Sequence, residues 1–237
     1  MHRKKQPTTI STVWILSLAS LLCTTQALAG DVTGSLALPD SISYEKPLGS
    51  CKDRHCFWDE RNGVVASQRL SRELSNEIAV VAIGRSSETT PNSFDLHLRG
   101  GGVEPSTLVA GVGSTLRVSN DDAFERKPLL GNSKELSGSA MAARTARTLK
   151  LLETGTQLVT DKTLPHAQGY IHVLSKLAAV ASVSDSGAFR FTDLKSGSYT
   201  VQVYFQDQLI AKKNISVPAR GTLKLDTLAV SKSGTKK

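Results

Sequence analysis

Two cysteines and a histidine lie close together in this sequence, and these residue types can form either a disulfide or a metal site. The segment from Cys51 to Cys56 reads Cys-Lys-Asp-Arg-His-Cys and includes His55. A closed structural zinc site needs four ligands, whereas only three candidates lie together here. In an oxidising compartment, a lone pair of cysteines this close usually forms a disulfide. We therefore expect a Cys51–Cys56 disulfide, with a metal site as the alternative.

The remaining histidines could bind a metal only if folding brought them together. After residue 29 these are His97, His166 and His172. His166 and His172 are six residues apart and would share a face of one continuous strand, although Pro165 would keep His166 outside such a strand. A metal-binding or electron-transfer protein that uses these histidines with the cysteine pair is therefore an alternative function.

Common catalytic motifs are missing from the sequence. It has no Gly-x-Ser-x-Gly elbow, no His-Glu-x-x-His and no paired-carboxylate motif. Gly100-Gly101-Gly102 resembles a phosphate-binding loop, but no Lys-Ser or Lys-Thr pair and no helix signal follows it, so we expect a turn. The sequence therefore predicts a non-enzyme without a cofactor, and a hydrolase with a different motif is the other possibility.

The first 29 residues have the three parts of a cleavable secretory signal. Basic residues 3–5 precede an apolar run over residues 13–22, and Ala27-Leu28-Ala29 fits a small-x-small cleavage site. The run is shorter than the about 20 apolar residues that a bilayer span needs. A lipid anchor at Cys23 is disfavoured because a leucine precedes it. We expect cleavage before Gly30, and a periplasmic or secreted protein that has no membrane span.

The charge of the chain argues against a nucleic-acid partner. The formal net charge is +8, and removal of the three basic residues of the signal leaves +5 (8 − 3). Residues 231–237 contribute part of this charge, and we expect a disordered basic tail there. Arg144, Arg147 and Lys150 would share one face of a helix that the composition predicts over residues 134–153. That face could bind an acidic surface, but a solvated face is the simpler interpretation.

Short strand patterns dominate the rest of the chain. A polar stretch at 41–62 predicts a long loop, and turns are expected at 185–187 and 193–197. Apolar or alternating runs predict strands at 32–39, 77–84, 93–98, 115–120, 169–174, 180–183, 189–191, 199–205, 215–217 and 223–225. Short strands separated by frequent turns are typical of a β-sandwich.

The segment from Ala181 to Val201 resembles a carboxypeptidase regulatory-like repeat. The resemblance rests on Asp185, Gly187 and Phe189, on Gly197, and on Tyr199-Thr200. That module has a transthyretin-like fold. The resemblance therefore implies a small immunoglobulin-like β-sandwich over residues 175–230, without an activity of its own.

Two earlier segments are similar to periplasmic cupredoxin-like proteins of the plastocyanin-like or methylamine-utilisation-like kind. Residues 113–122, which end in Asn120-Asp121-Asp122, are similar to a strand of that family that ends in Asn-x-Asp. Residues 165–171, which read Pro-His-Ala-Gln-Gly-Tyr-Ile, are similar to its last strand. This resemblance implies a cupredoxin-like Greek-key β-sandwich over residues 30–174.

The copper ligands of that family do not stand at the matching positions. A type 1 copper site needs two imidazoles, a thiolate and usually a thioether. Arg126 occupies about the position of a ligand histidine. The positions of cysteine, histidine and methionine are taken by Asp161, Leu164 and Ala167. We therefore expect a cupredoxin-like scaffold without copper, in which Arg126 and Asp161 pair across the former site.

The sequence as a whole predicts an exported all-β protein, a cupredoxin-like sandwich followed by a small transthyretin-like one. The expected function is a non-catalytic binding or structural module of the cell envelope. Its expected partner is an envelope protein or a polysaccharide, whose identity no motif in the chain indicates.

Overall fold

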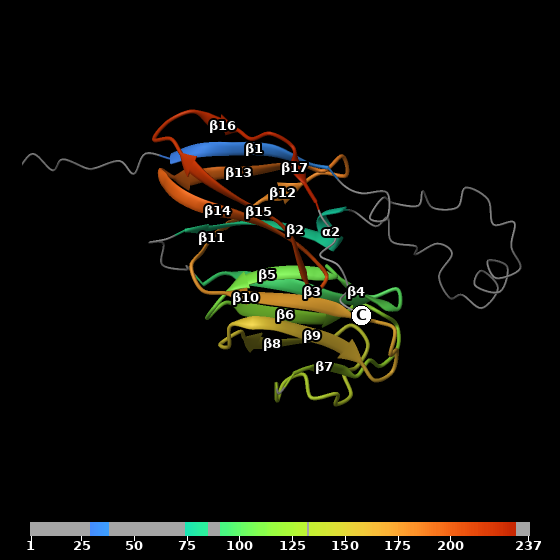
Figure 1. The fold of residues 1–237 in the computed structure, drawn as a ribbon. Helices are drawn as coiled ribbons and strands as arrows, with labels where there is room; N and C mark the ends of the chain where they lie inside the picture. The colour runs from blue at the N-terminus through green and yellow to red at the C-terminus, as the bar shows by residue number, and fades with distance from the viewer. Residues whose placement is uncertain (1–28, 38–73, 85–90, 132, 231–237) are drawn as a thin grey trace, which may run out of the picture.

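The computed structural model describes residues 29–37, 74–84, 91–131 and 133–230, and it consists almost entirely of β-strands (Figure 1). The all-β class expected from the sequence is confirmed. The described part contains no helix long and apolar enough to cross a bilayer. Cys51, His55, Cys56, most of the expected signal peptide and the basic tail lie outside the described residues, so the predictions about them stay predictions.

Residues 93–174 form a β-sandwich of two four-stranded sheets, which we call the inserted sandwich. One sheet has the order β4-β3-β6-β8 and the other has the order β5-β10-β9-β7. The strands of the first sheet are β3 (Ser93–Arg99), β4 (Gly102–Glu104), β6 (Thr115–Asn120) and β8 (Ala146–Lys150). The strands of the second are β5 (Thr107–Gly111), β7 (Pro128–Leu130), β9 (Gly155–Asp161) and β10 (Gly169–Leu174).

Alternating side chains explain why these segments form a sandwich. In β3, Leu96 and Leu98 are fully buried, and in β6 Leu116 and Val118 fill the same core. Since successive strand residues face opposite sides, the intervening polar residues lie on the outer face of the sheet. The pairs β3–β6 and β5–β10 are parallel, because the chain crosses between the two sheets before it returns.

A second sandwich, which we call the C-terminal sandwich, is built from strands at both ends of the described chain. Its sheets have the orders β11-β2-β14-β15 and β12-β13-β1-β16, and β17 pairs with β1. A single-turn helix, α2 (Leu74–Glu77), precedes β2. The strands are β1 (Ala29–Ala37), β2 (Ile78–Gly84), β11 (Leu177–Val180), β12 (Ser182–Val183), β13 (Ala188–Lys195), β14 (Gly197–Phe205), β15 (Gln208–Val217), β16 (Thr222–Lys224) and β17 (Leu228–Ala229).

These sheets divide the chain differently from the boundary expected after residue 174. Strand β1 pairs antiparallel with β13, and β2 pairs antiparallel with β14. Residues 29–37 and 78–84 therefore share sheets with the C-terminal strands, and not with the cupredoxin-like segment to which the sequence assigned them. Residues 93–174 are inserted between β2 and β11.

The helix expected over residues 134–153 is wrong. Residues 146–150 form β8, which pairs antiparallel with β6 and buries Leu149 in the core. Ahead of β8, Gly138 has φ 76° and Arg144 has φ 60°, and neither value is compatible with a right-handed helix. Arg147 binds backbone carbonyls within residues 135–140, so it does not share a helix face with Arg144 and Lys150.

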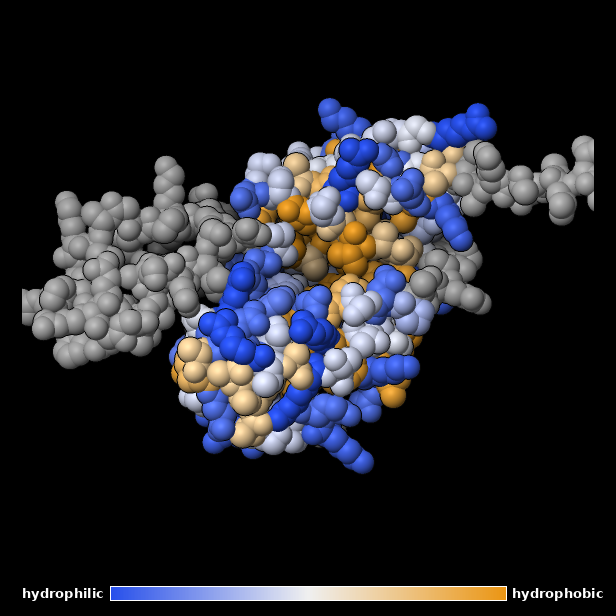
Figure 2. Space-filling model, turned by 180° about the vertical axis from the view of Figure 1, so that it is seen from behind, coloured by the Kyte–Doolittle hydropathy of each residue, from blue (hydrophilic) through white to orange (hydrophobic). Residues whose placement is uncertain are grey.

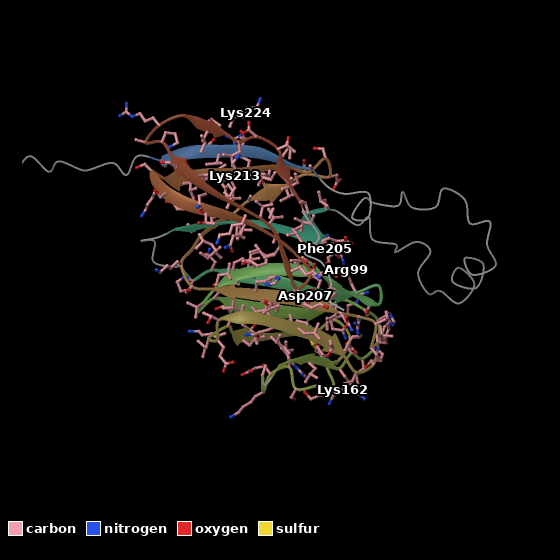
Figure 3. The ribbon with its side chains drawn as sticks, in the orientation of Figure 1. Arg99, Lys162, Phe205, Asp207, Lys213 and Lys224 are labelled. Atoms are coloured by element: carbon pink, nitrogen blue, oxygen red, sulfur yellow. The ribbon has the colours of Figure 1, made fainter. Side chains whose placement is uncertain are left out.

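The two sandwiches meet at a junction that is partly apolar. Val109 of β5 packs into one buried cluster with Ala79, Val81, Leu177 and Tyr204 of the C-terminal sandwich. The tip of the β14–β15 hairpin, which carries Phe205 and Asp207, reaches the inserted sandwich beside β10 (Figure 3).

Candidate functional site

Arg126 lies at one corner of the inserted sandwich, in the segment between β6 and β7. Its backbone forms an isolated bridge with Met141, with both N–H···O bonds made. Its side chain has 0% exposure. A guanidinium stays protonated in proteins, so a buried arginine requires anionic partners.

Two carboxylates hold the Arg126 guanidinium. Nε donates to Asp161 Oδ2 at 2.8 Å, and Nη1 donates to Asp122 Oδ2. The exposed ring of Phe124 lies 5.9 Å from the guanidinium carbon, within the range of a cation–π contact. The expected pairing of Arg126 with Asp161 is therefore present. The second partner, Asp122, was not anticipated from the sequence.

Backbone groups fix both carboxylates in place. Asp122 Oδ1 accepts a hydrogen bond from Gly100 N–H at 2.8 Å. Asp161 Oδ1 accepts hydrogen bonds from Thr163 N–H at 2.6 Å and from Leu164 N–H at 3.1 Å. Burial would raise the pKa of the Asp161 carboxyl, but the hydrogen bonds and the charge of Arg126 outweigh it and hold this pKa below its usual value.

A buried asparagine sets the path of the loop that carries Asp122 and Arg126. Asn120 Nδ2 donates to the backbone carbonyls of Phe124, Met141 and Ala142. Asn120 Oδ1 accepts from Asp122 N–H at 3.2 Å. The Asn-x-Asp turn noted in the sequence therefore has a structural role, because it aims the second aspartate at the arginine.

The other two positions of the expected degenerate site follow Asp161 in the same loop. Leu164 packs partly buried against the sandwich core, and Ala167 is buried in that core. Ala167 N–H donates to Leu164 O at 2.8 Å. These side chains supply apolar contact and no donor atom for a metal.

The corner does not fit a copper ion. Copper proteins of the blue type offer neutral imidazole, thiolate and thioether donors. Here the Arg126 guanidinium fills the corner, and both carboxylates are already bound to it. Across the described ranges, no group of three or more His, Cys, Asp or Glu side chains is arranged to hold a metal.

The three described histidines lie in different surroundings. His97 Nδ1 contacts both Asp121 Oδ2 at 2.8 Å and Ser119 Oγ at 2.9 Å. Because both partners meet the same ring nitrogen, this group is not a Ser-His-Asp relay, which uses both nitrogens. His166 is exposed on the loop after β9, and His172 is buried at the junction of the sandwiches.

Comparison with known proteins gives structural similarity alone. No family model and no curated protein matches the chain. A copper-containing nitrite reductase from Thermus scotoductus SA-01 is 16% identical over 38% of this chain and 23% of its own, with a TM-score of 0.30. A reduced amicyanin variant is 19% identical over 40% of this chain and 99% of its own, and a Cu(I) amicyanin variant is 20% identical over 39% and 98%, both with a TM-score of 0.30. Similarity at this level says nothing about copper or activity in this chain.

Proposed function

We propose that this chain is an exported, non-catalytic β-sandwich protein that binds or supports an envelope protein or polysaccharide and no longer binds copper. The observation that carries the proposal is the buried Arg126, held by Asp122 and Asp161. It occupies about the position where the cupredoxin resemblance places a ligand histidine. The basic and apolar segments of residues 1–29 support export to the periplasm or the medium.

Arg126, Asp122 and Asp161, which we call the ion triad, hold together the loops that a metal would hold together at this corner. A copper ion ties together loops that are distant in sequence. Here the ion pair joins Arg126 and Asp161, which are 35 residues apart in the sequence. Asp122 in turn accepts a hydrogen bond from Gly100 N–H, 22 residues earlier in the sequence. A metal ion would have to displace the guanidinium from the two carboxylates that it already binds. The loops are therefore closed without a metal.

The test is copper addition to protein purified from the periplasm, whose intact mass also shows whether residues 1–29 have been removed. We expect no intense visible absorption, because that colour requires a copper–thiolate bond. We expect residual Cu(II) binding in calorimetry to weaken in a His97→Gln/His166→Gln variant, which removes the two described imidazoles that reach solvent and leaves Arg126, Asp122 and Asp161 intact. A stoichiometric, thiolate-ligated copper centre would overturn the proposal.

A further inference from the structure

The expected signal cleavage site coincides with the start of a paired strand. Residues 27–29 read Ala-Leu-Ala, and cleavage is expected between Ala29 and Gly30. Strand β1 begins at Ala29, which lies opposite Lys195 of β13, and Gly30 lies opposite Leu194. The first residues of most domains are poorly ordered unless they are tied down. Here the site itself belongs to the sheet.

Strand β1 is covered along both of its edges. In its sheet it lies between β13 on one side and β16 and β17 on the other (Figure 1). Asp31 N–H donates to Gly221 O at 3.1 Å. Hydrophobic side chains that stay at the surface gather near the junction of the two sandwiches in the view of Figure 2, whereas Val32 and Leu36 of β1 are 0% and 5% exposed. The strand is therefore held by its neighbours and by the core.

The residue that follows the expected cut has little free space around it. Gly30 is buried, and a Cβ at this position would lie 2.9 Å from Pro218 O and 3.1 Å from Gly221 O. The next residue is fixed through its side chain, because the Asp31 carboxylate pairs with the Arg190 guanidinium. Proteases cut folded chains at exposed loop tips or after local opening. In the closed sandwich this bond is therefore out of reach of a peptidase.

The strands that cover the site are among the last parts of the chain to be synthesised. β13, β16 and β17 all begin after residue 187. Until these strands are made, the partners that cover both edges of β1 do not exist, and the bond between Ala29 and Gly30 stays open. Completion of the C-terminal sandwich then closes it.

We propose that folding of the C-terminal sandwich closes the signal cleavage site, so that a signal peptidase has to cut between Ala29 and Gly30 before β13 pairs with β1. This inference rests on the export proposed above. In the cut, water adds its OH to the Ala29 carbonyl carbon and a proton to the Gly30 nitrogen as the peptide bond breaks. The shortened chain then folds with Gly30 as its first residue, whereas a chain that folds first keeps its signal peptide.

Cleavage of the full-length chain by purified signal peptidase in mild detergent tests the proposal. The chain is made by cell-free synthesis without membranes, so that the signal peptide stays attached, and intact mass identifies the bond that is cut. Phe191 is 1% exposed and lies opposite Val32, so the buried charge in Phe191→Asp prevents the sandwich from closing. We expect the folded parent chain to be cut at least about 100-fold more slowly than Phe191→Asp, because cleavage of a protected bond follows the population of the open form.

The matched control moves the cleavage site out of the strand and leaves the sandwich folded. It carries a Gly-Ser-Gly-Ser-Gly-Ser spacer between Ala29 and Gly30, which reaches about 20 Å when extended and keeps a glycine after the cut. Thermal unfolding establishes that this chain and the parent are folded and that Phe191→Asp is not. We expect the spacer chain to be cut about as fast as Phe191→Asp.

The outcomes separate this inference from the proposed export. A folded parent chain that is cut as fast as Phe191→Asp overturns the inference and leaves export intact, as does a spacer chain that is cut as slowly as the parent. If none of the three chains is cut after Ala29, export by this signal fails together with the inference.

Discussion

At the scale of single residues, the charge of Arg126 is acceptable in the interior only because two carboxylates and their backbone donors surround it. Removing one member of such a network leaves an uncompensated buried charge, which costs far more than the network itself contributes. The stability of this corner therefore depends on all three charges together.

We predict that Arg126→Met destabilises the protein by about 3–5 kcal/mol, because Asp122 and Asp161 then stay buried without a cation. Urea unfolding measures the change. Arg117→Met is the matched control. The Arg117 side chain is 53% exposed, and its Nη1 lies 3.6 Å from Oδ1 of the exposed Asp95. A surface ion pair of this kind contributes at most about 1 kcal/mol to stability. Adding Asp122→Asn to Arg126→Met should recover part of the loss. Equal costs for the two arginines would show that the triad is not a buried charge network.

The sequence predicted one half of this site and missed the other. The family resemblance pairs Arg126 with Asp161, because it puts both at positions where that family has copper ligands. Asp122 was visible in the Asn120-Asp121-Asp122 turn, but its direction could not be read from spacing. Asp121 turns to His97, and only its neighbour turns to Arg126. A buried guanidinium has five N–H donors, more than one carboxylate can accept, and this requirement could have indicated further acceptors nearby.

At the scale of elements, the sequence located strands well and their partners poorly. The run at 169–174 was predicted with the bounds of β10, because apolar runs bounded by turn residues are a local signal. The pairing of β1 with β13 puts Ala29 opposite Lys195, which is 166 positions later in the sequence (195 − 29). No local pattern encodes such a pairing. Alanine-rich helix propensity over 134–153 was likewise overridden, because β8 gains its pairing with β6.

Gly34 tests the placement of β1 in the C-terminal sandwich. It lies opposite Phe189 of β13, and a Cβ at this position would lie 2.8 Å from Cε1 of that buried ring. We predict that Gly34→Ala destabilises the protein by about 1–3 kcal/mol through overpacking. Gly102→Ala is the control, since its Cβ would meet nothing closer than 3.7 Å.

A second variant replaces the Phe189 ring, which causes the clash, with a smaller side chain. Gly34→Ala should cost less in a Phe189→Leu background than in the parent protein, because the smaller side chain leaves room for the methyl group. Thermal unfolding of the four proteins gives the coupling. If the cost of Gly34→Ala is the same in both backgrounds, β1 does not lie against Phe189.

At the scale of the whole molecule, the inserted sandwich is fastened to the C-terminal one by polar bonds as well as by apolar contact. Ser106 N–H donates to Asn76 O at 2.7 Å, and Gln206 N–H donates to Thr107 Oγ1 at 2.8 Å. At the same junction His172, 2% exposed, packs against Tyr204 with ring centroids 4.3 Å apart and ring planes tilted by 35°. These contacts hold the two sandwiches together at the junction.

His172 makes this junction sensitive to acid. Its Nε2 lies 2.6 Å from Gln206 O and its Nδ1 lies 2.9 Å from Thr156 Oγ1, so the neutral ring donates with one nitrogen and accepts with the other. Burial lowers the pKa of His172 below 6.5, and the Gln206 carbonyl and the Asp207 charge raise it without offsetting the burial. The unfolded chain therefore binds the proton more readily, and stability that is complete above about pH 6.5 is lost as the pH falls below that value.

Urea unfolding at about pH 7.5 and about pH 5 measures this loss. The free energy of unfolding should fall less on acidification in His172→Gln than in the parent protein. His166→Gln, which changes an exposed histidine away from the junction, should keep the parent's loss. If His172→Gln loses as much stability on acidification as the parent, His172 does not titrate at the junction and other groups cause the loss.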